Sequence, residues 1–192
     1  MNPESIFEEE APKIKVNLAK TYGCAVQGIK ATLVTVETNI SAGVNLFIVG
    51  LPDSAVKESQ HRINAVLKYI GHKIPGKGVT INMAPADIKK EGSAYDLPIA
   101  LGILAATQQV PAGPLEGLEF AGELALSGEL RPIRGALAMT LAAHRDGRAF
   151  VLPEASARQA ALVPGAIVHP AKSLAQVCAH LAGREKLDRV EG

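Results

Sequence analysis

The residues best suited to chemistry lie close together between Lys89 and Asp96, in the sequence Lys-Lys-Glu-Gly-Ser-Ala-Tyr-Asp. A serine hydroxyl beside a neutral lysine amine can act as nucleophile and base, the chemistry of Ser/Lys peptidases. Ser93 would be the nucleophile here, with Lys89 or Lys90 as its base. We expect both lysines to be solvated and therefore protonated at pH 7, which argues against catalysis by this pair.

The same segment also carries signals for the start of a helix. Ser93 and Asp96 have the Ser-x-x-Asp spacing of a capping box. With Ser93 as the cap, however, Pro98 would fall where the helix needs an N–H to bond the Ala94 carbonyl. With Asp96 as the cap, Pro98 falls in the first turn, where no donor is needed. We therefore predict that Asp96 is the N-cap and that Ser93 lies in the preceding loop.

Other motifs for cofactors and metals are incomplete. Residues 71–78 (GHKIPGKG) nearly spell a phosphate-binding loop, but Gly78 replaces the Ser or Thr that would hold Mg²⁺. A helix is expected before this segment and a strand after it, the reverse of a phosphate loop, so we predict a turn. The histidines show no pair at metal-binding helical spacing: His61, His72, His144, His169 and His180. We expect no cofactor and no metal site in this chain.

Composition indicates an ordinary globular domain. The 192 residues are 47% hydrophobic and 20% charged. No apolar run reaches the roughly 18 residues of a membrane span, and the acidic N-terminus is unlike a secretory signal. Cys24 and Cys178 are too few for a disulfide framework. We expect a cytoplasmic protein without membrane contact. The net charge of +1 gives no global attraction for nucleic acid, so DNA contact would need a local basic patch.

The elements that must position the charged segment begin with strands. Residues 31–38 and 44–49 are rich in branched side chains and flank a Ser-Ala-Gly turn, which predicts an antiparallel hairpin. Asp53 or Ser54 then caps a helix. Its buried stripe has helical spacing: Ile63, Val66, Leu67 and Ile70. Its remaining faces are expected to be solvated: Lys57, Glu58, His61, Arg62 and Lys68.

The later elements alternate. A strand at residues 79–83 leads through the charged loop to a helix at 97–108, which is apolar on nearly all faces and therefore expected to be central. Residues 120–130 alternate as a strand that turns at Ser127-Gly128, and a helix is expected at 136–145. Strands and helices then alternate to residue 181, which predicts βαβ units and an α/β fold with a mixed sheet.

Three regions differ in composition. Residues 1–19 are charged and lack periodicity, so we interpret them as a leader or cloning remnant that is poorly ordered, and residues 184–192 as a charged tail. Residues 20–183 form the predicted domain. Lys and Ile dominate up to Gln108, whereas Arg and Ala dominate afterwards. A fusion of two related sequences near residues 105–112 and a simple difference between sheet and helical layers both explain this shift.

Four stretches carry a family resemblance: residues 50–59 (GLPDSAVKES), 82–92 (NMAPADIKKEG), 93–98 (SAYDLP) and 122–132 (GELALSGELRP). They resemble the N-terminal domain of the ComM/YifB family, also labelled magnesium-chelatase-like or ChlI-related AAA+ ATPases. The resemblance covers residues 20–183. It implies the fold of the Lon protease domain, akin to the second domain of ribosomal protein S5.

The resemblance also bears on catalysis. Aligned without gaps on the serine and lysine motifs of Lon proteases, this chain has Ala94 in place of the nucleophile and Leu137 in place of the base. A methyl group cannot attack and an isobutyl group cannot accept a proton. The resemblance therefore implies no catalytic residues and no enzyme activity in this chain. A one-residue shift would restore Ser93 as an alternative nucleophile. ATP binding would belong to another module of the parent protein.

Three functions follow as expectations from the resemblance. The first is an assembly or partner-docking element of a hexameric DNA branch-migration motor, whose partners are the AAA+ module and further copies in a ring. The second is a nucleic-acid-binding module with a basic patch of four residues: Lys89, Lys90, Arg131 and Arg134. The third, a magnesium chelatase subunit of tetrapyrrole synthesis, rests on the family label alone, since the sequence suggests no metal or porphyrin pocket.

Overall fold

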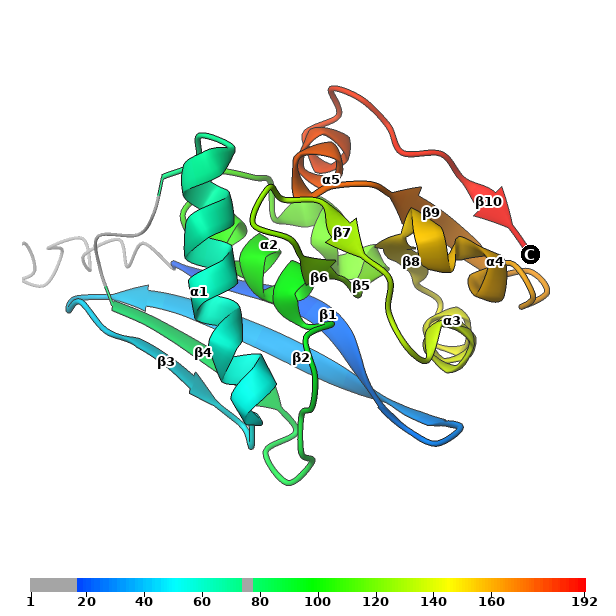
Figure 1. Ribbon diagram of the computed structural model, residues 1–192, viewed down its shortest axis with the longest axis horizontal. Coiled ribbons are helices and arrows are strands. Elements are labelled where there is room, and N and C mark those ends of the chain that lie inside the picture. The colour runs from blue at the N-terminus through cyan, green and yellow to red at the C-terminus, as the bar shows by residue number, and fades with distance from the viewer. Residues whose placement is uncertain (1–16, 74–77) are drawn as a thin grey trace, which may run out of the picture.

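A computed structural model describes residues 17–73 and 78–192 (Figure 1). Most of the predicted leader, residues 1–19, lies outside the described residues. So does the central part, 74–77, of the glycine-rich segment 71–78 that we predicted as a turn. Within the two described ranges, no helix combines the length and the apolar composition that a membrane crossing needs.

The first sheet has the strand order β1-β2-β4-β3. β1 (Leu18–Gln27) and β2 (Lys30–Ser41) form an antiparallel hairpin, and β4 (Gly78–Ala84) pairs antiparallel with β2. β3 (Leu46–Val49) pairs in parallel with β4. The predicted hairpin between residues 31–38 and 44–49 is therefore wrong, because β4 lies between them. Since β3 and β4 are joined through a helix, they form a parallel crossover unit, and β4 takes the free edge of β2.

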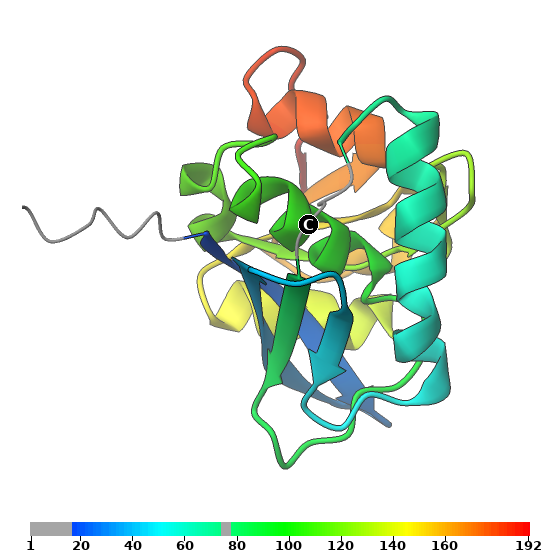
Figure 2. The same ribbon diagram turned by 90° about the vertical axis from the view of Figure 1, so that its left-hand side faces the viewer.

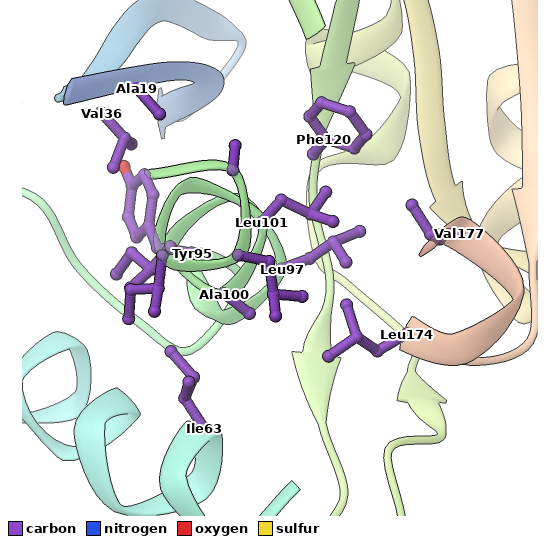
Figure 3. Packing of buried hydrophobic residues seen from close by; sticks show 14 of the residues in the cluster. Ala19, Val36, Ile63, Tyr95, Leu97, Ala100, Leu101, Phe120, Leu174 and Val177 are labelled. Atoms are coloured by element: carbon purple, nitrogen blue, oxygen red, sulfur yellow. The ribbon is translucent and has the colours of Figure 1, made fainter. Parts of the chain in front are cut away.

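Two helices pack on this sheet. α1 (Ser54–Tyr69) is the crossover helix. Of its predicted stripe, Ile63, Val66 and Leu67 are buried, whereas Ile70 is the C-cap and is only partly buried. α2 (Asp96–Ala106) is buried at all eleven positions, as predicted for a central helix. Figure 2 shows α2 between the first sheet and the C-terminal elements. Side chains of α2 and of the residue before it contact both sides: Leu97 and Leu101 lie near Phe120 and the C-terminal helix, and Tyr95 lies near Val36 of β2 (Figure 3).

The second sheet has the order β10-β9-β8-β5. β5 (Leu118–Phe120), β8 (Ala149–Pro153) and β9 (Ile167–Ala171) are parallel, which confirms the predicted βαβ rhythm. The connecting helices are α3 (Ala136–Arg145), α4 (Ala157–Ala160) and α5 (Leu174–Leu181), with short 3₁₀ helices η2 (Gly113–Gly117) and η3 (Glu154–Ser156). The molecule is thus a mixed α/β fold.

Two smaller features complete the fold. β6 (Glu123–Leu124) and β7 (Leu130–Arg131) form the hairpin predicted to turn at Ser127-Gly128. Residues 184–192, interpreted from sequence as a charged tail, contribute β10 (Val190–Glu191), which pairs antiparallel with β9. Leu187, before this strand, is buried, so the segment packs on the molecule and its end belongs to the second sheet.

Candidate functional site

A cleft of about 800 Å³ lies where the charged loop meets the end of β1. Three segments form its walls: residues 24–27 of β1 with the following Gly28, Lys89 and residues 91–95 before α2, and residues 132–135 before α3, with Glu123 and Met139 completing them. Of Ala94 and Leu137, the two residues expected at the Lon catalytic positions, Ala94 lines the cleft. Leu137 lies on α3 with 42% of its surface exposed and is not part of the lining.

Lys90 was predicted to be solvated, and this is wrong. The residue is fully buried, and its Nζ donates hydrogen bonds to the carbonyl oxygens of Gly50, at 2.7 Å, and Pro85. Its main chain pairs with the same region: Lys90 N donates to Leu51 O at 3.0 Å, and Asp53 N donates to Lys90 O at 2.9 Å. Burial lowers the pKa of Lys90. Its amine is therefore committed to two carbonyls outside the cleft lining.

The loop that receives Lys90 requires unusual backbone angles. Gly50 has a φ of 107°, and an added Cβ would lie 2.2 Å from the Met83 carbonyl oxygen. Leu51 follows with a φ of 59°. Only glycine tolerates so close an approach at Gly50. This backbone path carries the chain across the end of β4 and places the Gly50 carbonyl where Lys90 reaches it.

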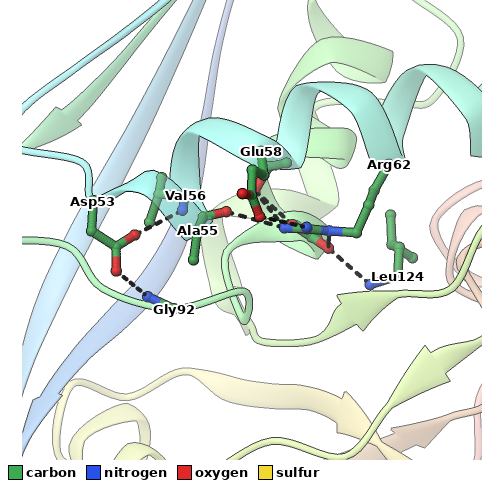
Figure 4. Close-up of polar contacts among 9 residues, drawn as sticks. Asp53, Ala55, Val56, Glu58, Arg62, Gly92 and Leu124 are labelled. Carbon is green, nitrogen blue, oxygen red and sulfur yellow. Dashed lines mark hydrogen bonds and ion pairs between the residues drawn. The ribbon is translucent and has the colours of Figure 1, made fainter.

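Asp53 connects the start of α1 to the cleft. One carboxylate oxygen accepts from Val56 N at 2.8 Å, which confirms Asp53 as the helix cap. The other accepts from Gly92 N at 3.0 Å (Figure 4). Because Gly92 precedes Ser93 and Ala94, this single side chain fixes the loop wall of the cleft relative to α1.

Asp96 is not the helix cap that the sequence predicted. Tyr95 occupies that position without a side-chain cap bond, and Asp96 is the first helical residue. Its buried carboxylate accepts from Ser59 Oγ at 2.6 Å, from Arg62 Nε at 2.7 Å and from Leu124 N at 3.0 Å. A cap must bond its own helix, whereas these partners lie on α1 and β6. Asp96 therefore joins three elements.

Arg62 was expected on a solvated face, and this expectation is also wrong. Only 20% of its side chain is exposed, and it lies along α1 toward β6 (Figure 4). The hydrogen-bonded Asp96 carboxylate raises the pKa of Arg62. The partners are 34 residues apart in sequence, so helical spacing within α1 alone could not identify the pair.

The predicted basic patch is dispersed. Lys89 and Arg134 line the cleft, whereas Arg131 is exposed outside the lining and Lys90 is buried. Lys89 Nζ lies 3.3 Å from a Glu91 carboxylate oxygen. Arg131 is the cross-strand partner of Glu123 in the β6–β7 hairpin. Two of the three exposed cations, Lys89 and Arg131, therefore have a glutamate as a neighbour.

Two further titratable groups were missed by sequence reasoning. Cys24 lines the cleft with only 6% exposed, and burial raises its thiol pKa to about 12. Glu119 on β5 is 1% exposed and lies 3.5 Å from the Arg148 guanidinium, which itself lies 4.0 Å from the centre of the Tyr22 ring. Burial raises the pKa of Glu119 to about 7. Nothing adjacent in the sequence marks either residue as buried.

Comparison with known proteins gives the family. Residues 36–156, more than half of the chain, match the family described as "Subunit ChlI of Mg-chelatase". The chain belongs to the ChlI family. Among the described residues of this ChlI-family chain, no group of three or more His, Cys, Asp or Glu side chains is placed to hold a metal ion.

Relatives within the ChlI family confirm the resemblance to ComM and YifB. The chain is 43% identical over 173 residues to "Competence protein ComM" of Haemophilus influenzae. It is 41% identical over 175 residues to "Uncharacterized protein YifB" of Salmonella typhimurium. These alignments cover 90% and 91% of this chain but 34% and 35% of the relatives. The chain thus spans about a third of the length of the curated relatives it matches.

A more distant similarity links the ChlI-family chain to a protease. It is 26% identical over 140 residues to "Lon protease 3" of Sorangium cellulosum, covering 68% of this chain and 16% of that protein. This similarity fits the expected relation to Lon.

Proposed function

We propose that this chain is a catalytically inactive domain with the Lon-protease fold, within a longer ComM/YifB-type ATPase of the cytoplasm. Its role is assembly or partner docking on a hexameric ring that drives branch migration of recombining DNA. The AAA+ module and neighbouring copies in the ring are its expected partners. The Lon similarity and the mixed α/β architecture support the fold assignment.

The proposal that the chain is inactive depends on the contacts made by the two lysines near Ser93. A peptidase base must be a neutral amine in contact with the serine. Lys90 is bound to two carbonyls away from the cleft lining, and Lys89 is an exposed partner of Glu91. Ala94 and Leu137 stand at the positions that align with the Lon pair. The Cys24 thiol, with its raised pKa, does not supply a thiolate nucleophile.

A peptidase assay tests inactivity. The purified chain is incubated with a fluorogenic peptide, beside Ser93→Ala and the control Ser41→Ala, an exposed serine outside the cleft. We expect all three proteins to show the same background rate. Turnover that disappears in Ser93→Ala but persists in Ser41→Ala would overturn the proposal.

Deleting the domain from the parent protein tests docking. We expect loss of ring assembly in analytical ultracentrifugation and loss of branch migration on a synthetic junction. The matched control is the parent protein carrying Lys172→Ala, which alters an exposed side chain outside the cleft without removing the fold. A deletion that leaves both assembly and migration unchanged contradicts a docking role.

A further inference from the structure

The wall of the cleft formed by β1 is the edge of a sheet. β1 pairs only with β2 within the first sheet. Ile40 N donates to Asn17 O at 2.9 Å, which identifies this pair as a hydrogen-bonded one. Hydrogen-bonded pairs recur at every second residue of an antiparallel ladder. In the observed register they end at Gln27 and Lys30. Cys24 and Val26 fall between such pairs, so their N–H and C=O groups point away from β2.

These outward groups lie on the part of β1 that lines the cleft. Just before it, the second sheet packs on one face of β1, since a Cβ on Gly23 would lie 3.7 Å from the Phe120 carbonyl oxygen. β5 ends at Phe120, and beyond that point residues 24–28 line the cleft. In the described parts of the chain no strand pairs with this stretch on its outer side. Main-chain groups in a partly buried groove are satisfied most completely by another main chain.

The rest of the cleft suits an extended polypeptide. Another part of the lining contains small residues, Gly92, Ser93 and Ala94, while Val26, Ile133 and Met139 provide apolar surface. A volume of about 800 Å³ is within the range of ligand-binding clefts. The charged lining residues comprise two cations and two carboxylates: Lys89, Arg134, Glu91 and Glu123. They favour a segment without large net charge.

We propose that the cleft binds an extended segment of a partner protein by strand addition to residues 24–27 of β1. The segment's main chain bonds the outward groups of Cys24 and Val26, and one of its apolar side chains contacts Val26, Ile133 and Met139. This is the way in which exposed sheet edges recognise peptides. The inference rests on the proposed docking role and names the partner's chemistry; the bound segment is held without being cleaved.

Binding is tested with the 192-residue chain and a permanently unfolded probe, fluorescein-labelled reduced and carboxymethylated α-lactalbumin. Fluorescence anisotropy gives the affinity. Val26→Pro removes one outward N–H, whereas the matched Val26→Thr keeps it. Because one main-chain bond and its local fit are lost, we expect Val26→Pro to weaken binding by about tenfold and Val26→Thr to bind like the wild type.

A second pair of variants tests the apolar contact. Ala94→Trp fills the cleft, and Leu162→Trp adds the same group at an exposed position outside it. We expect binding to be lost only in Ala94→Trp, with thermal melting confirming that each variant folds. Amide exchange provides an independent readout, because bound probe should slow exchange at Val26 N–H, while Ala25, already paired with β2, should change little.

The outcomes separate the two proposals. Absence of saturable binding to the wild-type chain, or equal binding by Ala94→Trp and Leu162→Trp, overturns strand addition while inactivity stands. Cleavage of the probe, detected by gel electrophoresis, overturns inactivity while the binding site stands. Weakened binding in both Val26→Pro and Ala94→Trp, with intact probe, supports both.

Discussion

Lys90 and Asp96 are buried charged residues that fix the two ends of the loop lining the cleft. Lys90 joins this loop to the Gly50 turn, and Asp96 joins its helical end to α1 and β6. Burying a charge is costly unless it has hydrogen-bond partners, and the partners of these two residues hold several main-chain positions at once. The geometry of the cleft therefore depends on two side chains that do not themselves bind a ligand.

Replacing Lys90 should destabilise the fold. Lys90→Met keeps the length of the side chain but leaves the carbonyls of Gly50 and Pro85 without their donor. We expect the free energy of unfolding to fall by about 2 kcal/mol in urea denaturation. The exposed neighbour provides the control, since Lys89→Met should change it by less than about 0.5 kcal/mol. Equal effects of the two variants would show that the buried amine is dispensable.

Breaking the Arg62–Asp96 pair should cost more. Asp96→Ala leaves the Arg62 guanidinium and the Ser59 hydroxyl without their acceptor, and we expect a loss of about 3–5 kcal/mol. Arg62→Met and the double variant complete a double-mutant cycle, which should give a coupling energy above about 1 kcal/mol. Glu58, 66% exposed and 3.9 Å from Arg62, serves as control, and Glu58→Ala should have little effect. Additive losses in the cycle would contradict a specific pair.

Glu119 should make stability depend on pH. Its folded pKa of about 7 lies above the ordinary value of 4.5, so the folded state binds more protons between these values. Its contribution is fully present below pH 4.5 and is lost as pH rises through 7. Glu119→Gln should therefore be more stable than wild type at pH 8, on the order of 2 kcal/mol, and this difference should shrink at pH 5.5. Chemical denaturation at both pH values measures it, with exposed Glu129→Gln as control. A difference independent of pH would refute the assignment.

The residue-scale predictions from sequence succeeded for local interactions. Asp53 caps a helix that begins at the next residue, so its role is visible in the adjacent sequence. Lys90 and Arg62 acquire their partners across 40 and 34 residues. Lys89 and Lys90 are chemically identical neighbours, yet one is solvated and one is buried. Only the folded backbone distinguishes them.

At the scale of elements, α2 and the first sheet approach each other unusually closely. A Cβ on Gly102 would lie 2.5 Å from Thr38 Oγ1 on β2. The helix can therefore pack directly on the Thr38 side chain only because position 102 lacks a side chain of its own. This contact sets the depth at which α2, and with it the cleft loop, lies on the sheet.

Gly102→Ala tests this contact. Alanine favours helix formation by about 1 kcal/mol over glycine, but the added methyl forces α2 away from β2, which typically costs about 1–3 kcal/mol. We expect a lower melting temperature despite the better helix former. Gly117→Ala, with open space around the added methyl, should leave it unchanged. A higher melting temperature for Gly102→Ala would contradict the close packing.

Periodicity predicted the elements better than their pairing. The helix at 136–145 and the buried α2 follow from patterns within a few turns. The partner of residues 31–38 did not, because the short turn before 44–49 suggested a local hairpin. The true partner, β4, follows α1 in the sequence. The residues of β2 and β3 give no sign that β4 lies between these two strands.

At the scale of the whole molecule, α2 serves as a common core for both sheets. Leu97 and Leu101 lie toward the second sheet, and Tyr95 lies toward the first (Figure 3). Because α2 packs on both sheets, its separation from one sheet would also disrupt its packing against the other. The cleft lies at this junction. β1 comes from the first sheet, and residues 132–135 lead into α3, which precedes β8 of the second sheet.

The shared helix predicts a single unfolding transition. In urea, hydrogen exchange measured by NMR should give coincident midpoints for amides of β2 and β8, because both sheets lose α2 together. The terminal strand β10 provides an internal comparison and should exchange at lower urea concentration through local opening. Separate midpoints for β2 and β8 would show that the two sheets are independent units.

The two native thiols offer a practical advantage for such experiments. Cys24 and Cys178 are almost wholly enclosed, and their pKa values of about 12 and about 11 leave little thiolate at pH 7.5. We therefore expect maleimide dyes to react with neither thiol under native conditions. A reporter cysteine introduced at the cleft mouth could be labelled selectively without first removing the natural ones.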